Sequence, residues 1–323
     1  MDTVTFDGVT FNGMSAQTLS KKKVSLKLKV TCQAIPEDDN CRAVDVLCRR
    51  TGMSRLMAKR IRIHGRLTCN GQFHRMIDRV KTGDVLEAGL PSENEKPVSI
   101  RHIPEAPFLY RDQWLVVVAK PTGMVIHPTY LHHEGSLTDR LSDLPLHPVI
   151  RLDRDTSGAV LIALNGHAHY VLTQNKMEKF YIGMVHGKMR SHTGLIQAPV
   201  GRVEGSIMLR QVSTDGSPAY TAWQVIRYYH ETDVSLVRFK LLTGRTHQIR
   251  VHCQSIGHPL VGDGLYGWLE TPQATGLDRL IGRQALHASE LFFTHPETFT
   301  AIRVTAPFPE DFRQLLKRAA KRE

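Results

Sequence analysis

The segment that decides both the fold and the chemistry of this chain is Ile150–Gly158, which reads IRLDRDTSG. It places two carboxylates, two arginines, a threonine, a serine and a glycine between apolar segments. Such a loop has three possible interpretations. It can be a solvated turn in which Asp155 caps the residues after it, an Asp-x-Asp phosphotransfer loop, or a loop with a single catalytic carboxylate, Asp153, held by an arginine.

The phosphotransfer interpretation fits the surrounding residues poorly. Such loops follow a long apolar strand, but residues 144–152 (LPLHPVIRL) are interrupted by two prolines. The position two residues after the second aspartate holds Ser157 where a threonine or valine is usual. A magnesium ion would need a second acidic cluster, and Asp263 stands largely alone in VGDGLYG. Phosphotransfer is therefore a distant alternative.

A second polar segment, LTGRTHQIRVHCQSIG at residues 242–257, favours the single-carboxylate interpretation. Gly244 is expected to form a turn and Thr246 to cap a helix over 246–256. On that helix Arg250 points away from the apolar face, and Arg245 lies just before it. An arginine beside Asp153 would keep that carboxylate ionised, as a nucleophile requires.

Metal and nucleotide chemistry find little support in the sequence. The histidines of this segment, His247 and His252, have no cysteine or carboxylate at ligand spacing, so we expect them to have structural roles or to contact the binding partner, and we expect no metal. No glycine-rich phosphate loop is present, so no nucleotide cofactor is expected. Strands predicted at 114–119, 159–164 and 234–242, with helices at 166–175 and 246–256, are spaced too irregularly for a doubly wound sheet.

The overall charge indicates a polyanionic partner. The 323 residues include 42 Lys+Arg and 31 Asp+Glu, which gives a net charge of +11. The most apolar short run, residues 114–119, is far too short to cross a bilayer, so nucleic acid is preferred over a membrane. The five cysteines form no CxxC pair and the first residues do not resemble a signal peptide, so we expect a soluble cytoplasmic protein.

The basic charge is concentrated before a proline-rich segment at 91–107, which we interpret as a linker. Residues 1–90 hold sixteen Lys+Arg and nine Asp+Glu, so +7 of the net charge lies there. Residues 24–30 alternate like an edge strand. Residues 53–66 predict a helix capped by Ser54 and ended by Gly65, with a basic face free of acidic residues. Its expected RNA-binding residues are Arg55, Lys59, Arg60, Arg62 and Arg66.

Residues 41–86 resemble the RNA-binding domain first seen in ribosomal protein S-four. The resemblance rests on the basic helix after Ser54, on HGRLTCNG (64–71) and on VKTGDVL (80–86). The Asn-Gly and Gly-Asp turns would close hairpins in a small sheet. This resemblance implies a small α+β domain at 41–90 that binds structured RNA, preceded by an unassigned extension at 1–40.

The second part of the chain resembles the RNA pseudouridine synthases of the RluA type. Three motifs occur in the family's order: IRLDRDTSG (150–158), KFYIG (179–183) and LTGRTHQIRVH (242–252). The resemblance extends over 110–312 through VAKPTGMVIHP (118–128), HPLVGDGLYG (258–267), QALHASELFFTHP (284–296) and APFPEDF (306–312). It implies an α+β catalytic domain at 108–323, with a mixed, largely antiparallel central sheet and flanking helices.

This resemblance also implies roles for individual residues. Asp153 would be the catalytic aspartate, Tyr181 would face the target base, and Arg250 would pair with Asp153. Ile150 departs from the family, which often has histidine there, and this change bears on local RNA contacts rather than on the nucleophile. The other residues expected to contact RNA in this domain are Arg151, Lys179, Arg245 and His247.

The implied reaction converts uridine to pseudouridine without cofactor or metal, in a protein expected to be a monomer. Family analogy favours large-subunit ribosomal RNA as substrate and transfer RNA as second choice. Asp153 would either attack the sugar carbon or remove a sugar proton, and the sequence leaves both open. The main rival is a non-catalytic RNA-binding or ribosome assembly factor of the same fold.

Overall fold

The computed structural model describes residues 29–89, 98–128, 134–144 and 146–321. The chain divides into two compact units, residues 1–93 and 94–323. Most of the strand expected at 24–30 lies outside the described residues. Among the described residues, no helix has the length and apolar character needed to cross a membrane.

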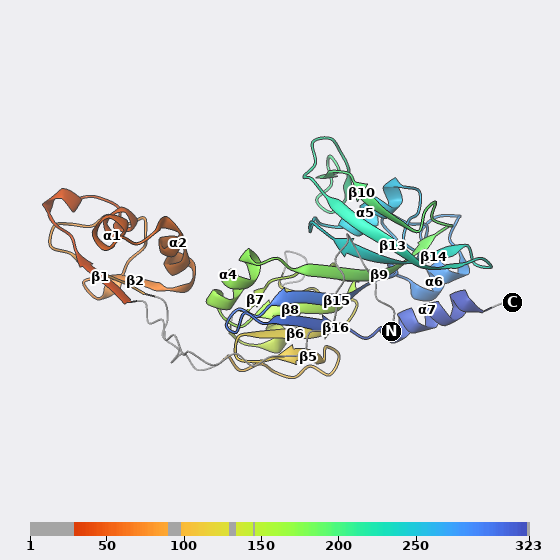
Figure 1. Cartoon of the computed structure of the whole chain (residues 1–323), viewed down its shortest axis with the longest axis horizontal. Helices are drawn as coiled ribbons and strands as arrows, with labels where there is room; N and C mark the ends of the chain where they lie inside the picture. The colour runs from red at the N-terminus through yellow and green to blue at the C-terminus, as the bar shows by residue number, and fades with distance from the viewer. Residues whose placement is uncertain (1–28, 90–97, 129–133, 145, 322–323) are drawn as a thin grey trace. The chain divides into compact units, whose positions relative to one another are not determined.

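The small unit is a four-stranded antiparallel sheet with two helices (Figure 1). Alternating apolar side chains of the helices and strands form one core, which includes Leu47, Ile61 and Leu86. The strand order is β1-β4-β2-β3. The elements are β1 (Lys29–Gln33), η1 (Pro36–Asp38), α1 (Ala43–Thr51), α2 (Arg55–His64), β2 (Arg66–Cys69), β3 (Gln72–Phe73) and β4 (Val85–Gly89).

Two expectations for the small unit need correction. Because β1 pairs with β4 along its whole length, residues 29–40 belong to this unit and are not part of an extension. The Asn70-Gly71 turn closes the β2–β3 hairpin as predicted, with positive φ angles of 51° and 78°. The Gly83-Asp84 turn closes no hairpin, because the β4 strand that follows it pairs with β1 and β2.

Helix α2 has the predicted cap and faces. The Ser54 side chain accepts a hydrogen bond from Met57 N, and Ile61 is buried while Lys59 and Arg62 are exposed. The basic face is not free of acidic partners, because Arg55 forms a 2.7 Å ion pair with Asp45 of α1. The predicted contributions of the Arg60 and Arg66 side chains lie outside the described residues.

The large unit is built on a ten-stranded sheet, mixed and largely antiparallel as predicted (Figure 1). Its main order is β10-β13-β14-β9-β15-β8-β6-β5, with β16 on β15 and β7 on β8, and the β8–β15 pair is parallel. The strands are β5 (Phe108–Arg111), β6 (Leu115–Lys120), β7 (His147–Pro148), β8 (Ser157–Ala163), β9 (Glu178–His186), β10 (Thr193–Gln197), β13 (Tyr220–Tyr229), β14 (Val234–Leu241), β15 (Leu286–Thr294) and β16 (Ala301–Thr305).

Helices cover both faces of this sheet. On β6, Val116 and Val118 pack in the cluster that includes Leu137 of α3, whereas Leu115 and Val117 pack in the cluster that includes Leu172 of α4. This alternation explains why the strand is apolar without interruption from Leu115 to Ala119. The helices are α3 (Leu137–Leu141), α4 (Gly166–Gln174), α5 (Gln248–Ser255), α6 (Gly276–Ile281) and α7 (Glu310–Ala320).

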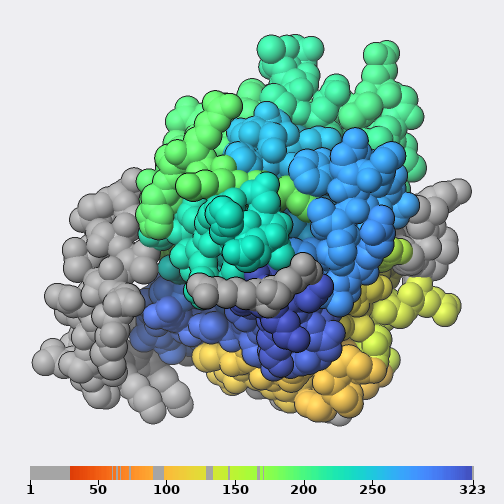
Figure 2. All heavy atoms as spheres, turned by 90° about the vertical axis from the view of Figure 1, so that its right-hand side faces the viewer, coloured from red at the N-terminus to blue at the C-terminus, as the bar shows by residue number. Residues whose placement is uncertain are grey.

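The last part of the predicted linker belongs to the large unit. Ile100, Ile103 and Ala106 are buried in the same cluster as Val116 and Val118, so residues 98–107 pack onto the sheet rather than connect domains freely. A separate two-stranded hairpin, β11 (Val200–Arg202) with β12 (Arg210–Val212), stands beside the main sheet. In Figure 2 the part of the surface coloured as residues near 200 projects at the top of the view.

Candidate active site

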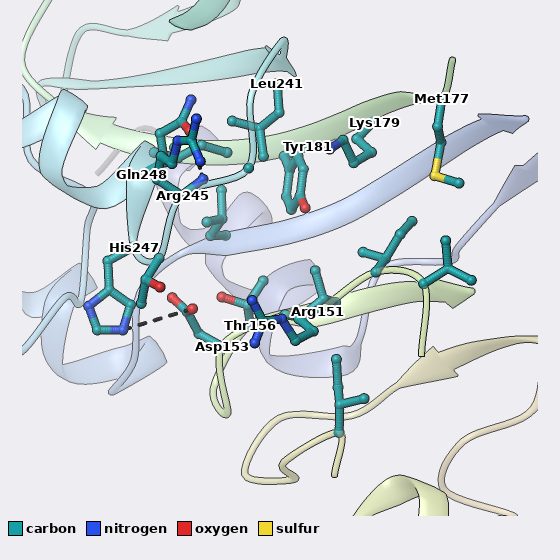
Figure 3. A pocket seen from close by; sticks show the side chains of 18 of the residues that line it. Arg151, Asp153, Thr156, Met177, Lys179, Tyr181, Leu241, Arg245, His247 and Gln248 are labelled. Atoms are coloured by element: carbon teal, nitrogen blue, oxygen red, sulfur yellow. Dashed lines mark hydrogen bonds and ion pairs between the residues drawn. The ribbon is translucent and has the colours of Figure 1, made fainter. Parts of the chain in front are cut away.

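The large unit contains a cavity of about 620 Å³ whose wall brings together the three polar segments of the sequence. The loop before β8 contributes Arg151 and Asp153, β9 contributes Tyr181, and the turn into α5 contributes Arg245 and His247 (Figure 3). These segments are far apart in sequence, and they meet because β9 lies between β14 and β15 while β15 pairs with β8.

The loop that carries Asp153 is bound by the side chain of Lys120. This lysine is 1% exposed, and its ammonium donates hydrogen bonds to the carbonyl oxygens of Pro121, Met124 and Arg154 at 2.7, 2.9 and 2.8 Å. Burial lowers the pKa of Lys120 to about 7, and the three carbonyl oxygens supply an acceptor for each proton of its charged form. The end of β6 is thereby tied to the residue directly after Asp153.

Gly158 ends this loop at a point where no side chain fits. Its φ angle is 122°, and a Cβ atom there would lie 2.2 Å from the carbonyl oxygen of Ala288. This close approach occurs where β8 runs parallel to β15. The glycine of the IRLDRDTSG motif is therefore required by the close backbone packing at the end of the loop.

Arg250 of α5 lies between two carboxylates. Its Nη1 donates to Asp153 Oδ2 at 3.2 Å, while Nε and Nη2 donate to the two oxygens of Asp263 at 2.7 and 2.8 Å. Burial works against the charge of Arg250, but the bonds to Asp263 and Asp153 outweigh it and raise the pKa. The bidentate pair with Asp263 therefore holds the Arg250 guanidinium in place. The Asp153 side chain is three quarters buried, and its remaining surface faces the cavity.

Tyr266 and His247 complete the surroundings of Arg250. The guanidinium carbon lies 4.9 Å from the centre of the Tyr266 ring, within cation–π distance. The Tyr266 hydroxyl accepts from Arg210 N and is bonded to His247 Nδ1, both at 2.8 Å. Burial, with the nearby arginines, lowers the pKa of His247, so the ring is neutral near pH 7. Because the Tyr266 hydroxyl donates its hydrogen bond to Nδ1, the proton of the neutral imidazole is on Nε2. This nitrogen lies 3.9 Å from Asp153 Oδ1.

Tyr181 supplies the aromatic wall of the cavity. It is 5% exposed and packs with Leu286 and Ile249, and its hydroxyl end reaches the cavity (Figure 3). Burial and the negative charge of Asp153 raise the pKa of its phenol, so the group remains protonated at neutral pH. The ring is placed to stack on a planar base, and its hydroxyl can donate a proton.

Comparison with known proteins assigns this arrangement to a family. Residues 114–255 match the family model described as RNA pseudouridylate synthase. The uncharacterized RNA pseudouridine synthase YjbO of Bacillus subtilis (strain 168) is 36% identical over 265 residues, which cover 78% of this chain and 90% of that protein. The ribosomal large subunit pseudouridine synthase C of Escherichia coli (strain K12) is 34% identical over 284 residues, 83% of this chain and 85% of that one.

The chain belongs to the RNA pseudouridine synthase family. It is therefore an enzyme that isomerises uridine in RNA, and the predicted resemblance to the RluA type is confirmed. Among solved structures, the human RNA pseudouridylate synthase domain containing 1 aligns with a TM-score of 0.50 at 26% identity, over 68% of this chain and 96% of that one. The human domain containing 4 protein, at 23% identity and a TM-score of 0.52, shares the fold.

The synthase brings most of the predicted catalytic-domain residues to one place. Asp153 and Arg250 are in contact as expected, and the cavity wall includes Tyr181. The residues expected to touch RNA in this domain, Arg151, Lys179, Arg245 and His247, also line the cavity. The basic residues of α2 belong to the small unit. His252 is buried between Thr221 Oγ1 and the carbonyl of Ala198, which is a structural role.

Three residues of the synthase site have no role predicted from the sequence, and one predicted helix cap is wrong. Asp263 was interpreted as isolated, yet it is the principal partner of Arg250. Lys120 and Tyr266 were present in flanking motifs without any role. Thr246 does not cap α5: the N-cap position is His247, which has a φ of 56°, and no side chain caps the helix there. In the described part of the chain, no three His, Cys, Asp or Glu side chains gather in a way that could hold a metal ion.

Proposed function

We propose that this synthase converts specific uridines of large-subunit ribosomal RNA to pseudouridine, with Asp153 as the catalytic carboxylate. The observation that carries the assignment of Asp153 is its position: it is the carboxylate that faces the cavity, and Arg250, held by Asp263, lies behind it. Transfer RNA is the second candidate substrate. We expect the protein to act as a monomer in the cytoplasm.

The proposed chemistry starts with a nucleotide that has left its stack, because a base within a helix cannot reach an enclosed carboxylate. The flipped uracil would rest against Tyr181. As the bond from ribose to the base breaks, the sugar carbon becomes electron-poor, and the negative Asp153 favours this change either by attacking the carbon or by removing a neighbouring sugar proton. The hydrogen bond from Arg250 keeps Asp153 oriented.

The preference for ribosomal RNA rests on the relatives. The Escherichia coli protein at 34% identity is named for the ribosomal large subunit, and so is the Nitrosomonas europaea pseudouridine synthase D, at 35% identity over 70% of this chain. The exposed basic residues Arg151 and Arg245 at the cavity suit the phosphates of a folded RNA. A ribosomal substrate would be long enough to engage both units.

For the small unit we propose the role of an S-four-like RNA-binding domain. Lys59 and Arg62 are exposed on α2, opposite to the buried Ala58 and Ile61. Exposed cations on one helix face are suited to phosphate contacts, which add affinity without reading the base sequence. The unit would then increase the time the enzyme stays on its RNA, while the cavity performs the chemistry.

The test is to incubate the pure protein with ribosomal and transfer RNA pools in the presence of a chelator and to map new pseudouridine. The wild-type protein is expected to form pseudouridine in the ribosomal RNA. Product only in transfer RNA would transfer the assignment to the second substrate. Tight binding without product in any pool would favour the rival interpretation, an RNA-binding or assembly factor without turnover.

A further inference from the structure

Lys179 occupies an unusual position on the cavity wall. Every second residue from Met177, just before β9, to Tyr181 lines the cavity: Met177, Lys179 and Tyr181 (Figure 3). Phe180 between them faces the other side of the sheet, where its ring centre lies 4.2 Å from the guanidinium carbon of Arg238. The period of the strand therefore places Lys179 on the same face as the tyrosine proposed to contact the base.

The charge of Lys179 is not balanced by its surroundings. Arg250 is paired with Asp153 and Asp263, and Arg154 is paired with Asp155 at 3.0 Å. Among the described residues, no carboxylate or carbonyl oxygen lies within hydrogen-bonding or ion-pair distance of the Lys179 ammonium. The residue is half-buried, and burial lowers its pKa. A cation in such a place gains free energy when an anion enters the cavity.

The reaction itself produces an anion in the cavity. When the bond between uracil N1 and the ribose carbon breaks, its electron pair stays with the base and is shared by N1, O2 and O4. The charge disappears after the base has turned, when the C5–ribose bond forms, C5 loses its proton and N1 gains one. Until then the detached base is negative, and the site must hold it in place.

We propose that Lys179 is a further catalytic residue, whose ammonium stabilises the negative charge of the detached uracil. The proposal rests on the proposed function of this cavity. Tyr181 cannot supply this charge because its phenol is neutral. The RNA phosphates are strongly hydrated and are better served by Arg151 and Arg245, which are exposed, whereas the base enters the cavity. The half-buried position of Lys179 therefore suits the base.

The test compares Lys179→Met and Lys179→Arg with the control Lys176→Met. Lys176 is exposed three residues earlier and does not line the cavity. With enzyme saturating over RNA, Lys179→Met is expected to lower the single-turnover rate constant by about 100-fold, the usual loss for one charge-stabilising donor. The RNA dissociation constant should change less than about threefold, and Lys179→Arg should restore part of the rate. A weaker affinity with an unchanged saturated rate would overturn the proposal and assign Lys179 to a phosphate.

An experiment with a different leaving group tests whether Lys179→Met lowers the rate only by distorting the cavity. In RNA carrying 5-fluorouridine at the target, the fluorine withdraws electrons and makes the departing base a more stable anion. If Lys179 stabilises that anion, the ratio of wild-type to Lys179→Met rates for loss of the starting nucleoside must become smaller. An equal ratio for both bases would show that the substitution distorts the cavity, and would overturn the proposal. Absence of product with the wild-type enzyme on ordinary RNA would instead contradict the proposed function.

Discussion

The two units of this protein differ in how far their cationic side chains are buried. In the small unit the basic side chains Lys59 and Arg62 are exposed, and among its described residues the buried polar side chains are Asp38 and Thr68. The large unit buries both partners of an ion pair, Arg250 and Asp263. An exposed charge attracts a phosphate but is screened and mobile, whereas a buried charge costs free energy and remains where the fold places it.

This difference in charge burial predicts that the small unit contributes to RNA affinity and the large unit to the rate of the reaction. Substitutions in the small unit are expected to change how tightly RNA is held and how strongly binding depends on salt. Substitutions in the buried network are expected to change the rate at saturating RNA. Three sets of substitutions and one change of pH test this division.

Asp153→Asn should reduce the rate constant at saturating enzyme by about 10⁴-fold or more while the RNA dissociation constant stays within a few-fold. The matched control is Asp155→Asn, two residues further in the same loop, where the carboxylate forms an ion pair with Arg154 instead of Arg250. This variant should retain most of its activity. Equal loss in both variants would support the Asp-x-Asp alternative, which also requires magnesium and a phosphoaspartate.

Asp263→Asn should lower the saturated rate by about 100-fold to 1000-fold, since Arg250 would lose its bidentate partner and shift toward Asp153. Breaking a buried ion pair should also lower the free energy of unfolding by about 3–5 kcal/mol. The control is Asp278→Asn, another fully buried carboxylate, which bonds His186 and Gly262 N instead. Urea unfolding and single-turnover rates at low temperature should show that the control loses stability but keeps its rate.

Acid should destabilise the large unit selectively. Burial, assisted by the positive charge of Arg283, lowers the pKa of His287 to about 4, although the hydrogen bond to the carbonyl of Ala306 acts in the opposite direction. An unfolded histidine binds its proton near pH 6.5, so this contribution is full above that pH and is lost as pH falls from about 6.5 to 4. The loss amounts to about 3 kcal/mol.

Hydrogen exchange of the whole protein at pH 7 and pH 4.5 measures this effect. Protection of β8 and β15 amides should fall more than protection of β4. His287→Gln should lessen the difference between the two pH values. A uniform loss of protection in both units would contradict the selective effect.

The smallest effect concerns α2. Replacing Lys59 and Arg62 together by glutamate should weaken RNA binding about tenfold and reduce the slope of log affinity against log salt by about 1.5 to 2. The saturated rate should not change. Lys81→Glu, at another exposed lysine of the same unit, controls for net charge. An unchanged salt slope would mean that α2 is only a solvated face.

Much of the site could be predicted because its chemistry lies in short segments. Asp153, Tyr181 and Arg250 each belong to a motif whose residue types are unusual together, and the fold had to bring the three motifs into contact. The strands were equally clear, because uninterrupted apolar runs such as residues 159–164 fit a sheet covered on both faces.

The missing parts depend on geometry that local sequence does not express. Asp263 meets Arg250 only because the chain reverses direction between α5 and Tyr266, so its carboxylate had no visible partner in sequence. The role of Lys120 could not be predicted because its hydrogen-bond acceptors are backbone carbonyls, which every residue carries. The role of Thr246 was wrong because His247 adopts a left-handed conformation, with a φ of 56°, and delays the helix by two residues.

The shared guanidinium of Arg250 has a consequence for the course of a turnover. In the proposed reaction Asp153 would lose its negative charge when it bonds to the sugar or takes up a proton. Arg250 would still be paired with both oxygens of Asp263, so its charge would remain neutralised without rotation toward solvent or uptake of a counterion. The reorganisation energy of the step is therefore small, and Asp153 returns to unchanged surroundings when its charge is restored.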